Sequence, residues 1–147
     1  MRPEREILHV DDDPQFTRLV SKRLEIFGYN VISVNDPSEA ISNLIHQNRR
    51  VVLLDIEMPG RNGLDVLKEI KKYDGGIQVI MLTGLVTVSS VLESLRLGAE
   101  AIFFKPLDDI DQLNESLERS FEKIDLWWSA LNELSARKRG NRVAAAE

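Results

Sequence analysis

The sequence predicts an α/β fold in which helices cover both faces of a five-stranded parallel sheet. Short apolar runs and amphipathic segments alternate five times along the chain, and turn residues separate them over short connections. This alternation is typical of parallel strands that are joined by helical crossovers. Because such crossovers are right-handed, few topologies remain, and we expect the doubly wound, flavodoxin-like strand order 2-1-3-4-5.

Each predicted strand is a short, mostly apolar run that ends at a polar residue or a turn. The strands are expected at residues 7–10, 31–34, 51–54, 79–82 and 101–104. The third run, Val51-Val52-Leu53-Leu54, contains no polar residue, which indicates a strand buried on both faces. This strand ends on Asp55, a carboxylate at a position where an unpaired charge would be costly.

The predicted helices follow the strands and repeat apolar residues at helical spacing. In the first helix, Pro14 suits the first turn, Asp13 suits the cap, and Gly28 ends the segment. Further helices are expected over residues 37–46, 64–73 and 86–97, and a last helix begins near Asp108. His9 is interpreted as a packed strand residue without a catalytic role.

The composition excludes several classes of protein. A net charge of −5 argues against a nucleic-acid binder that relies on a general basic surface. The absence of cysteine excludes a disulfide framework and a thiolate metal site. No apolar run approaches the length of a membrane span, and the first residues form no signal sequence. We therefore expect a cytoplasmic protein that contacts neither nucleic acid directly nor a membrane.

Polar side chains follow four strands that the expected order makes adjacent. Asp11 and Asp12 follow the first strand, and Asp55 follows the third. Thr83 follows the fourth strand and Lys105 the fifth. Each residue alone has a simple structural explanation, such as a helix cap or a solvated charge. Together they favour a ligand site, because an open α/β sheet binds ligands at the carboxyl ends of its strands.

The residue types in this cluster indicate phosphoryl chemistry. Three carboxylates packed together repel one another, and a divalent cation would offset that repulsion. Oxygen ligands with no His or Cys nearby in sequence favour Mg²⁺ or Mn²⁺ over zinc. A metal beside a carboxylate nucleophile, with an ammonium and a hydroxyl to meet developing charge, is typical of phosphoryl transfer.

The motifs that carry these residues resemble those of a known family. They are Asp-Asp after the first strand, L-L-D-I-E-M-P-G-R-N-G around Asp55, L-T-G at Thr83, and F-K-P at Lys105. They are similar to the motifs of response-regulator receiver domains of two-component signalling, which have a chemotaxis-regulator-like fold. The resemblance covers roughly residues 5 to 122, and the loop after Asp55 together with Lys105-Pro106 makes it specific.

The resemblance implies a phosphoacceptor and a metal site. Asp55 matches the aspartate that accepts a phosphoryl group from the phosphohistidine of a sensor histidine kinase or phosphotransfer protein. Asp11 and Asp12 match the acidic pair that binds Mg²⁺, and Asp55 and the backbone carbonyl of Glu57 match the other protein ligands. Such a phosphoprotein is a switch in a phosphorelay and catalyses only its own phosphorylation and dephosphorylation.

The resemblance also implies a switch, and at one position the chain departs from the family pattern. Thr83 matches the hydroxyl that turns to bond the phosphoryl group, and Lys105 matches the lysine that pairs with it. The family usually carries Tyr, Phe or His three residues before this lysine, where this chain has Ile102. An aliphatic side chain cannot swing a ring between exposed and buried positions. We therefore hypothesise that the chain signals by another route, through its last helix or its oligomeric state; alternatively, Ile102 is simply core and the rest of the switch suffices.

The last helix is longer than one sheet needs. A helix from residue 108 to about 138 would be about 45 Å long at about 1.5 Å per residue, so its second half should project. We expect a receiver domain over residues 1–122, a projecting helix over 123–139 and a flexible tail over 140–147. The exposed apolar face predicts a homodimer through this helix, with a fold-back or a further domain as alternatives. That face keeps a seven-residue rhythm, interrupted by one polar residue, Ser120; its apolar members are Ile110, Leu113, Leu117, Ile124, Trp127, Leu131 and Leu134.

Two other functions are compatible with the same fold. A pseudo-receiver would act as a constitutive dimerisation or scaffold module, which the complete set of acidic residues, Thr83 and Lys105 argues against and Ile102 favours slightly. A multi-turnover phosphatase would use the aspartyl nucleophile repeatedly, but the sequence shows no second general acid–base residue and no cap domain.

Overall fold

The computed structural model describes residues 5–146, and the side chains of residues 5–141. Its central sheet is parallel and has the order β2-β1-β3-β6-β7. This is the predicted order 2-1-3-4-5, because β4 and β5 form a separate short hairpin. The five strands are β1 (Glu6–Val10), β2 (Asn30–Val34), β3 (Val51–Leu54), β6 (Gln78–Thr83) and β7 (Ala101–Phe104).

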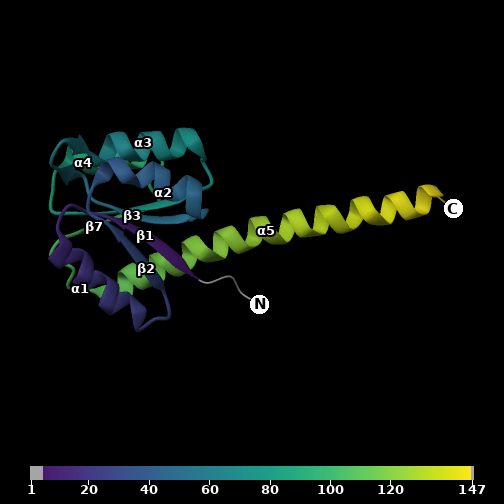
Figure 1. The fold of residues 1–147 in the computed structure, drawn as a ribbon, viewed down its shortest axis with the longest axis horizontal. Helices are drawn as coiled ribbons and strands as arrows, with labels where there is room; N and C mark the ends of the chain where they lie inside the picture. Colours follow the sequence, from purple (N-terminus) through teal and green to yellow (C-terminus); the bar gives the residue numbers. More distant parts are fainter. Residues whose placement is uncertain (1–4, 147) are drawn as a thin grey trace.

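Helices cover both faces of the sheet, as the alternation predicts (Figure 1). One face is covered by α1 (Pro14–Glu25) and by the first part of α5 (Ile110–Ala146). The other face is covered by α2 (Ala40–Gln47), α3 (Gly63–Tyr73) and α4 (Val88–Arg96), with one turn of 3₁₀ helix over Pro37–Glu39 before α2.

The apolar run of β3 supplies both halves of the core. All four of its side chains are fully buried. Val52 and Leu54 pack with α2 and α3, whereas Val51 and Leu53 pack with α1 and α5. This two-sided burial follows from the pleat, because successive side chains of a strand point to opposite faces.

Capping residues set the start of helices in the way that the sequence indicates. Asp13 Oδ1 accepts hydrogen bonds from the backbone N–H groups of Gln15 and Phe16, at 3.0 and 3.3 Å. Pro14 occupies the first turn, where its missing N–H costs nothing. This cap fixes α1 directly after the acidic residues that end β1.

The loop after β3 contains a hairpin that the sequence did not predict. β4 (Glu57–Met58) pairs antiparallel with β5 (Arg61–Asn62), and Gly60 takes a positive φ of 79° in the turn. Gly63 then begins α3 so close to the loop that an added Cβ would lie 1.8 Å from the Asp55 carbonyl oxygen. Only glycine therefore allows α3 to pack against the segment that carries Asp55.

Helix α5 continues far beyond the sheet and the helices that cover it (Figure 1). Every described side chain from residue 125 to residue 141 is exposed. The predicted flexible tail is wrong for residues 140–146, because the helix runs through Gly140 to Ala146. A single helical glycine costs only about 1 kcal/mol relative to alanine, and Ala144–Ala146 are strong helix formers. Residues 1–4 and Glu147, which the predicted domain and tail include, lie outside the described residues.

Candidate functional site

Three carboxylates meet at the carboxyl ends of β1 and β3. Asp11 and Asp55 are buried, with 0% and 3% of their surface exposed, whereas Asp12 is exposed. Each offers one oxygen, and these oxygens lie within 4.8 Å of one another. The sequence predicted this juxtaposition from the strand order alone.

Backbone hydrogen bonds continue the sheet past the strand ends and hold the cluster together. The Asp11 N–H donates to the Val34 carbonyl oxygen at 3.1 Å, and the Asp55 N–H donates to the Val10 carbonyl oxygen at 3.0 Å. Between β6 and β7, the Lys105 N–H donates to the Thr83 carbonyl oxygen at 2.8 Å. The residues of the site therefore stand on a rigid edge of the sheet.

Asp11 also organises the turn from β1 into α1. Its Oδ1 accepts a hydrogen bond from the Asp13 N–H at 3.0 Å. Its backbone carbonyl accepts one from Asn35 Nδ2 at 2.9 Å. One carboxylate oxygen thus shapes the loop, and the other, Oδ2, faces the site.

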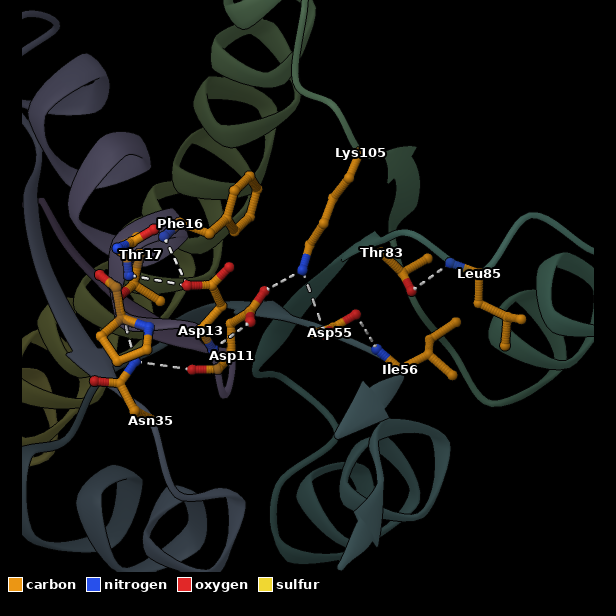
Figure 2. Close-up of polar contacts among 12 residues, drawn as sticks. Asp11, Asp13, Phe16, Thr17, Asn35, Asp55, Ile56, Thr83, Leu85 and Lys105 are labelled. Carbon is orange, nitrogen blue, oxygen red and sulfur yellow. Dashed lines mark hydrogen bonds and ion pairs between the residues drawn. The ribbon is translucent and has the colours of Figure 1, made fainter. Parts of the chain in front are cut away.

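Lys105 places its ammonium between the two buried carboxylates (Figure 2). Lys105 Nζ lies 2.6 Å from Asp11 Oδ2 and 3.4 Å from Asp55 Oδ2. The same nitrogen lies 4.4 Å from the centre of the Phe16 ring, within the range of a cation–π contact. Burial opposes the charged form, but the hydrogen bond and the charge of Asp11, followed by Asp55, raise the pKa of Lys105 above its ordinary value.

Asp55 carries more negative charge around it than one lysine offsets. Burial and then the charge of Asp11 raise the pKa of Asp55 above its ordinary value, against the opposing effect of Lys105. Asp55 Oδ1 accepts the Ile56 N–H at 2.8 Å, which fixes the carboxylate plane, and Oδ2 is directed to Lys105. A second cation in the cluster would stabilise the ionised form of Asp55.

Thr83 ends β6 beside β3, where the sequence placed it. Its side chain is fully buried, and its Oγ1 accepts the Leu85 N–H at 3.1 Å (Figure 2). This bond ties Thr83 to the loop that leads into α4, so a change in the position of the hydroxyl would be felt by that loop.

Two further residues, which the sequence did not indicate as part of the site, lie beside it. Phe16 lies under the ammonium of Lys105, and His9 meets the Phe16 ring edge-on at 5.9 Å between centroids. His9 is fully buried, and neither of its ring nitrogens has a hydrogen-bond partner among the described residues. Burial, followed by the charge of Lys105, lowers the pKa of His9 to about 3. The position of Phe16 in the first turn after Asp12 was the one sequence signal for this contact.

The remaining predicted positions lie around this cluster. Glu57 begins β4, directly after the Asp55 loop, and its side chain is exposed. Ile102 lies half-buried in β7 and packs against the core on the face of α4. It fills the core as an aliphatic residue would, and its side chain offers no ring to the switch.

The chain matches a known protein family over most of its length. The response regulator receiver domain is matched over residues 7–118 of the chain. This chain belongs to that family. Receiver domains are regulatory modules of two-component systems and usually bind Mg²⁺, for which the acidic cluster of Asp11, Asp12 and Asp55 is present.

Solved receiver domains share the fold over most of this chain. The receiver domain protein of Methanospirillum hungatei is 28% identical, with a TM-score of 0.76, and the match covers 84% of this chain and 98% of that one. Response regulator TrrA of Thermotoga maritima, solved in complex with Mg²⁺ and BeF, is 33% identical, with a TM-score of 0.72 and coverage of 79% and 98%.

Curated relatives are longer proteins that regulate transcription. ZraR of Escherichia coli is 35% identical over 115 residues, which cover 78% of this chain and 26% of ZraR. The CpxR homolog of Haemophilus influenzae is 38% identical over 117 residues, which cover 78% of this chain and 51% of that protein. The chain thus spans about a quarter to a half of the length of these relatives. Within residues 5–146, no helix combines the length and apolar character that crossing a membrane requires.

Proposed function

We propose that this receiver domain accepts a phosphoryl group on Asp55 from the phosphohistidine of a histidine kinase or phosphotransfer protein. The observation that carries the proposal is the cluster of three carboxylates, two of them buried, around one ammonium. Receiver-domain membership and the similarity to TrrA, solved with Mg²⁺ and BeF, support it.

The donor set fits a Mg²⁺ ion. Three carboxylates within 4.8 Å carry three negative charges in their ionised forms, and Lys105 supplies only one positive charge. Mg²⁺ favours oxygen ligands and keeps several waters, so exposed Asp12 and buried Asp11 and Asp55, with the Glu57 carbonyl, form a suitable partial shell. When bound, the ion would neutralise the charge that develops on the phosphoryl oxygens.

The residues of the chain perform the transfer itself. A carboxylate oxygen of Asp55 attacks the phosphorus atom as an O–P bond forms and the N–P bond of phosphohistidine breaks. The bonding electron pair leaves with the imidazole nitrogen. Ile56 N–H fixes the attacking carboxylate, and Lys105, already 3.4 Å from Asp55 Oδ2, stabilises the charge of the transferred group.

We place the signalling output on an element other than β7, where the family usually carries the aromatic switch residue and this chain has Ile102. The phosphoryl group would attract the Thr83 hydroxyl and so change its bond with Leu85 N–H. Because Ile102 has no ring to follow Thr83, we place the output on α5 and on the oligomeric state. The partner contacted through the projecting α5 is a second copy of the chain.

The binding of a phosphoryl analogue tests this proposal. We expect beryllofluoride with Mg²⁺ to give a new bound ¹⁹F signal with the wild-type protein, and no such signal with Asp55→Asn. The exposed Asp65→Asn variant is the matched control and should bind as the wild type does. Absence of the signal from the wild type would contradict the proposal. If the wild-type protein were also a dimer without binding beryllofluoride, a constitutive scaffold would be favoured.

A further inference from the structure

One side of α5 packs against the sheet in the first part of the helix and is exposed in the projecting part. Leu113 and Leu131 are 18 residues apart, which is five complete turns at 3.6 residues per turn, so they point in the same direction. Leu113 is fully buried under the sheet, whereas Leu131 is 52% exposed. Leu131 therefore continues, beyond the domain, the face that α5 buries inside it.

The part of this face that projects beyond the domain is apolar. We call Trp127, Trp128, Leu131 and Leu134 the α5 stripe; their exposed fractions are 68, 49, 52 and 49%. A groove of about 530 Å³ lies between the domain and the part of the stripe nearest to it. Arg50, Gly76 and Gln78 are among the residues that line the groove on the domain side. An exposed apolar face of this size indicates an interaction surface.

A second copy cannot pack on the stripe in parallel. In a parallel pair, the N-terminal half of the partner's α5 would have to lie against Leu113 and Leu117. The chain's own sheet already occupies that side of the helix. A parallel pair would also bring the basic runs Arg137-Lys138-Arg139 of both copies to the same level, where they repel.

We infer that the α5 stripes of two copies pack against each other in antiparallel orientation, with the two receiver domains at opposite ends. The inference rests on the homodimer of the proposed function and adds its orientation. The distal end of each helix then runs toward the open groove below the other domain. A two-fold axis near residue 132 makes the interface self-complementary, as in other isologous dimers.

The charges along α5 favour this orientation. With the axis near residue 132, Leu131 lies opposite Leu134 of the partner subunit, and Trp127 lies opposite the partner's Lys138, a pairing that suits a cation–π contact. The basic run Arg137-Lys138-Arg139 of each copy comes level with residues 126–128 of the other copy, next to Asp125 and away from the other basic run. The acidic and basic ends of α5 are thus complementary when antiparallel and repulsive when parallel.

A pair of matched variants tests whether the stripe is the interface. With Mg²⁺ and beryllofluoride present, light scattering should find wild-type dimers, and Leu131→Glu should yield monomers. Leu126 is 72% exposed and points about 140° away from Leu131 around the helix, so Leu126→Glu should remain dimeric. Wild-type monomers at high protein concentration, or dimers of Leu131→Glu, would overturn the inference.

A spin-label distance tests the orientation. The chain has no cysteine, so Glu118→Cys provides a single labelling site on an exposed position of α5. The antiparallel dimer should give a separation of about 45 Å, from about 1.5 Å per residue on either side of the axis. A separation of about 20 Å would indicate parallel helices and overturn the inference. Beryllofluoride binding of the same sample is measured separately, so that a failed phosphoryl site is not confused with a failed interface.

Discussion

Lys105 Nζ lies closer to Asp11 Oδ2, at 2.6 Å, than to Asp55 Oδ2, at 3.4 Å. The ammonium thus offsets the charge of a proposed metal ligand as well as that of the proposed phosphoacceptor. Because Mg²⁺ would also take a carboxylate oxygen of Asp11, the lysine and the metal would compete for the charge of this residue. Binding of the metal would free Lys105 to turn toward a phosphoryl group on Asp55.

Replacing this lysine should therefore make the fold depend on the metal. We expect Lys105→Met to lose about 1–3 kcal/mol of unfolding free energy in EDTA, since two buried carboxylates lose their partner. Mg²⁺ should stabilise this variant more than it stabilises the wild type. Urea unfolding with and without Mg²⁺ measures both effects. Lys123→Met, at an exposed pair with Glu100, is the control, and an equal loss in both variants would refute the account.

His9 should weaken the fold in acid. Its pKa is about 3 in the folded state, against 6.5 for an ordinary histidine. Above pH 6.5, His9 is unprotonated in both the folded and the unfolded protein. As the pH falls from 6.5 to 3, His9 binds a proton only in the unfolded protein. The free energy of unfolding therefore drops by about 1.4 kcal/mol per pH unit over this range. We expect His9→Val to have a shallower acid limb in urea unfolding measured in EDTA. The exposed His46→Gln is the matched control, and a His9→Val slope as steep as that of the wild type would count against this explanation.

Gly63 should tolerate no side chain. A Cβ would lie 1.8 Å from the Asp55 carbonyl oxygen and 2.7 Å from its carbon, so α3 or the Asp55 loop must move. We expect Gly63→Ala to lower the unfolding free energy by about 2–4 kcal/mol and to weaken Mg²⁺ binding. At Gly75 the nearest atom would be 3.9 Å away, so Gly75→Ala should fold with nearly unchanged stability. Similar thermal melting of both variants would show that the close approach has no consequence.

The aliphatic residue at position 102 should leave the α4 face largely unchanged by activation. We expect beryllofluoride to shift the amide NMR signals around Asp55 and along α5 more than those of α4 and β7. The physical reason is that Ile102 packs half-buried against the core and carries no ring to swing between exposed and buried positions. Shifts in α4 and β7 as large as those around Asp55 would contradict this route.

The sequence predicted the sheet and the cluster because both follow from local patterns. The apolar run of Val51 to Leu54 dictated a two-sided strand, and parallel strand order then brought Asp11, Asp55 and Lys105 to one edge. These features depend on periodicity and topology, which a single sequence contains.

Other features depend on tertiary contacts and could not be predicted in this way. The β4–β5 hairpin has only two residues per strand and exists because the loop is held between Asp55 and α3. The approach of Phe16 to Lys105 depends on how two side chains from distant segments are directed. The end of α5 depends on a small balance between Gly140 and the alanines after it.

The most direct test of the central claim is the intact mass of the protein after incubation with acetyl phosphate and Mg²⁺. The account predicts one added phosphoryl group on the wild type, none on Asp55→Ala, and none on the wild type in EDTA. Light scattering on the same samples would show whether the added group changes the oligomeric state. An unmodified wild type, or an equal adduct on Asp55→Ala, would contradict the assignment of Asp55 as the phosphoacceptor.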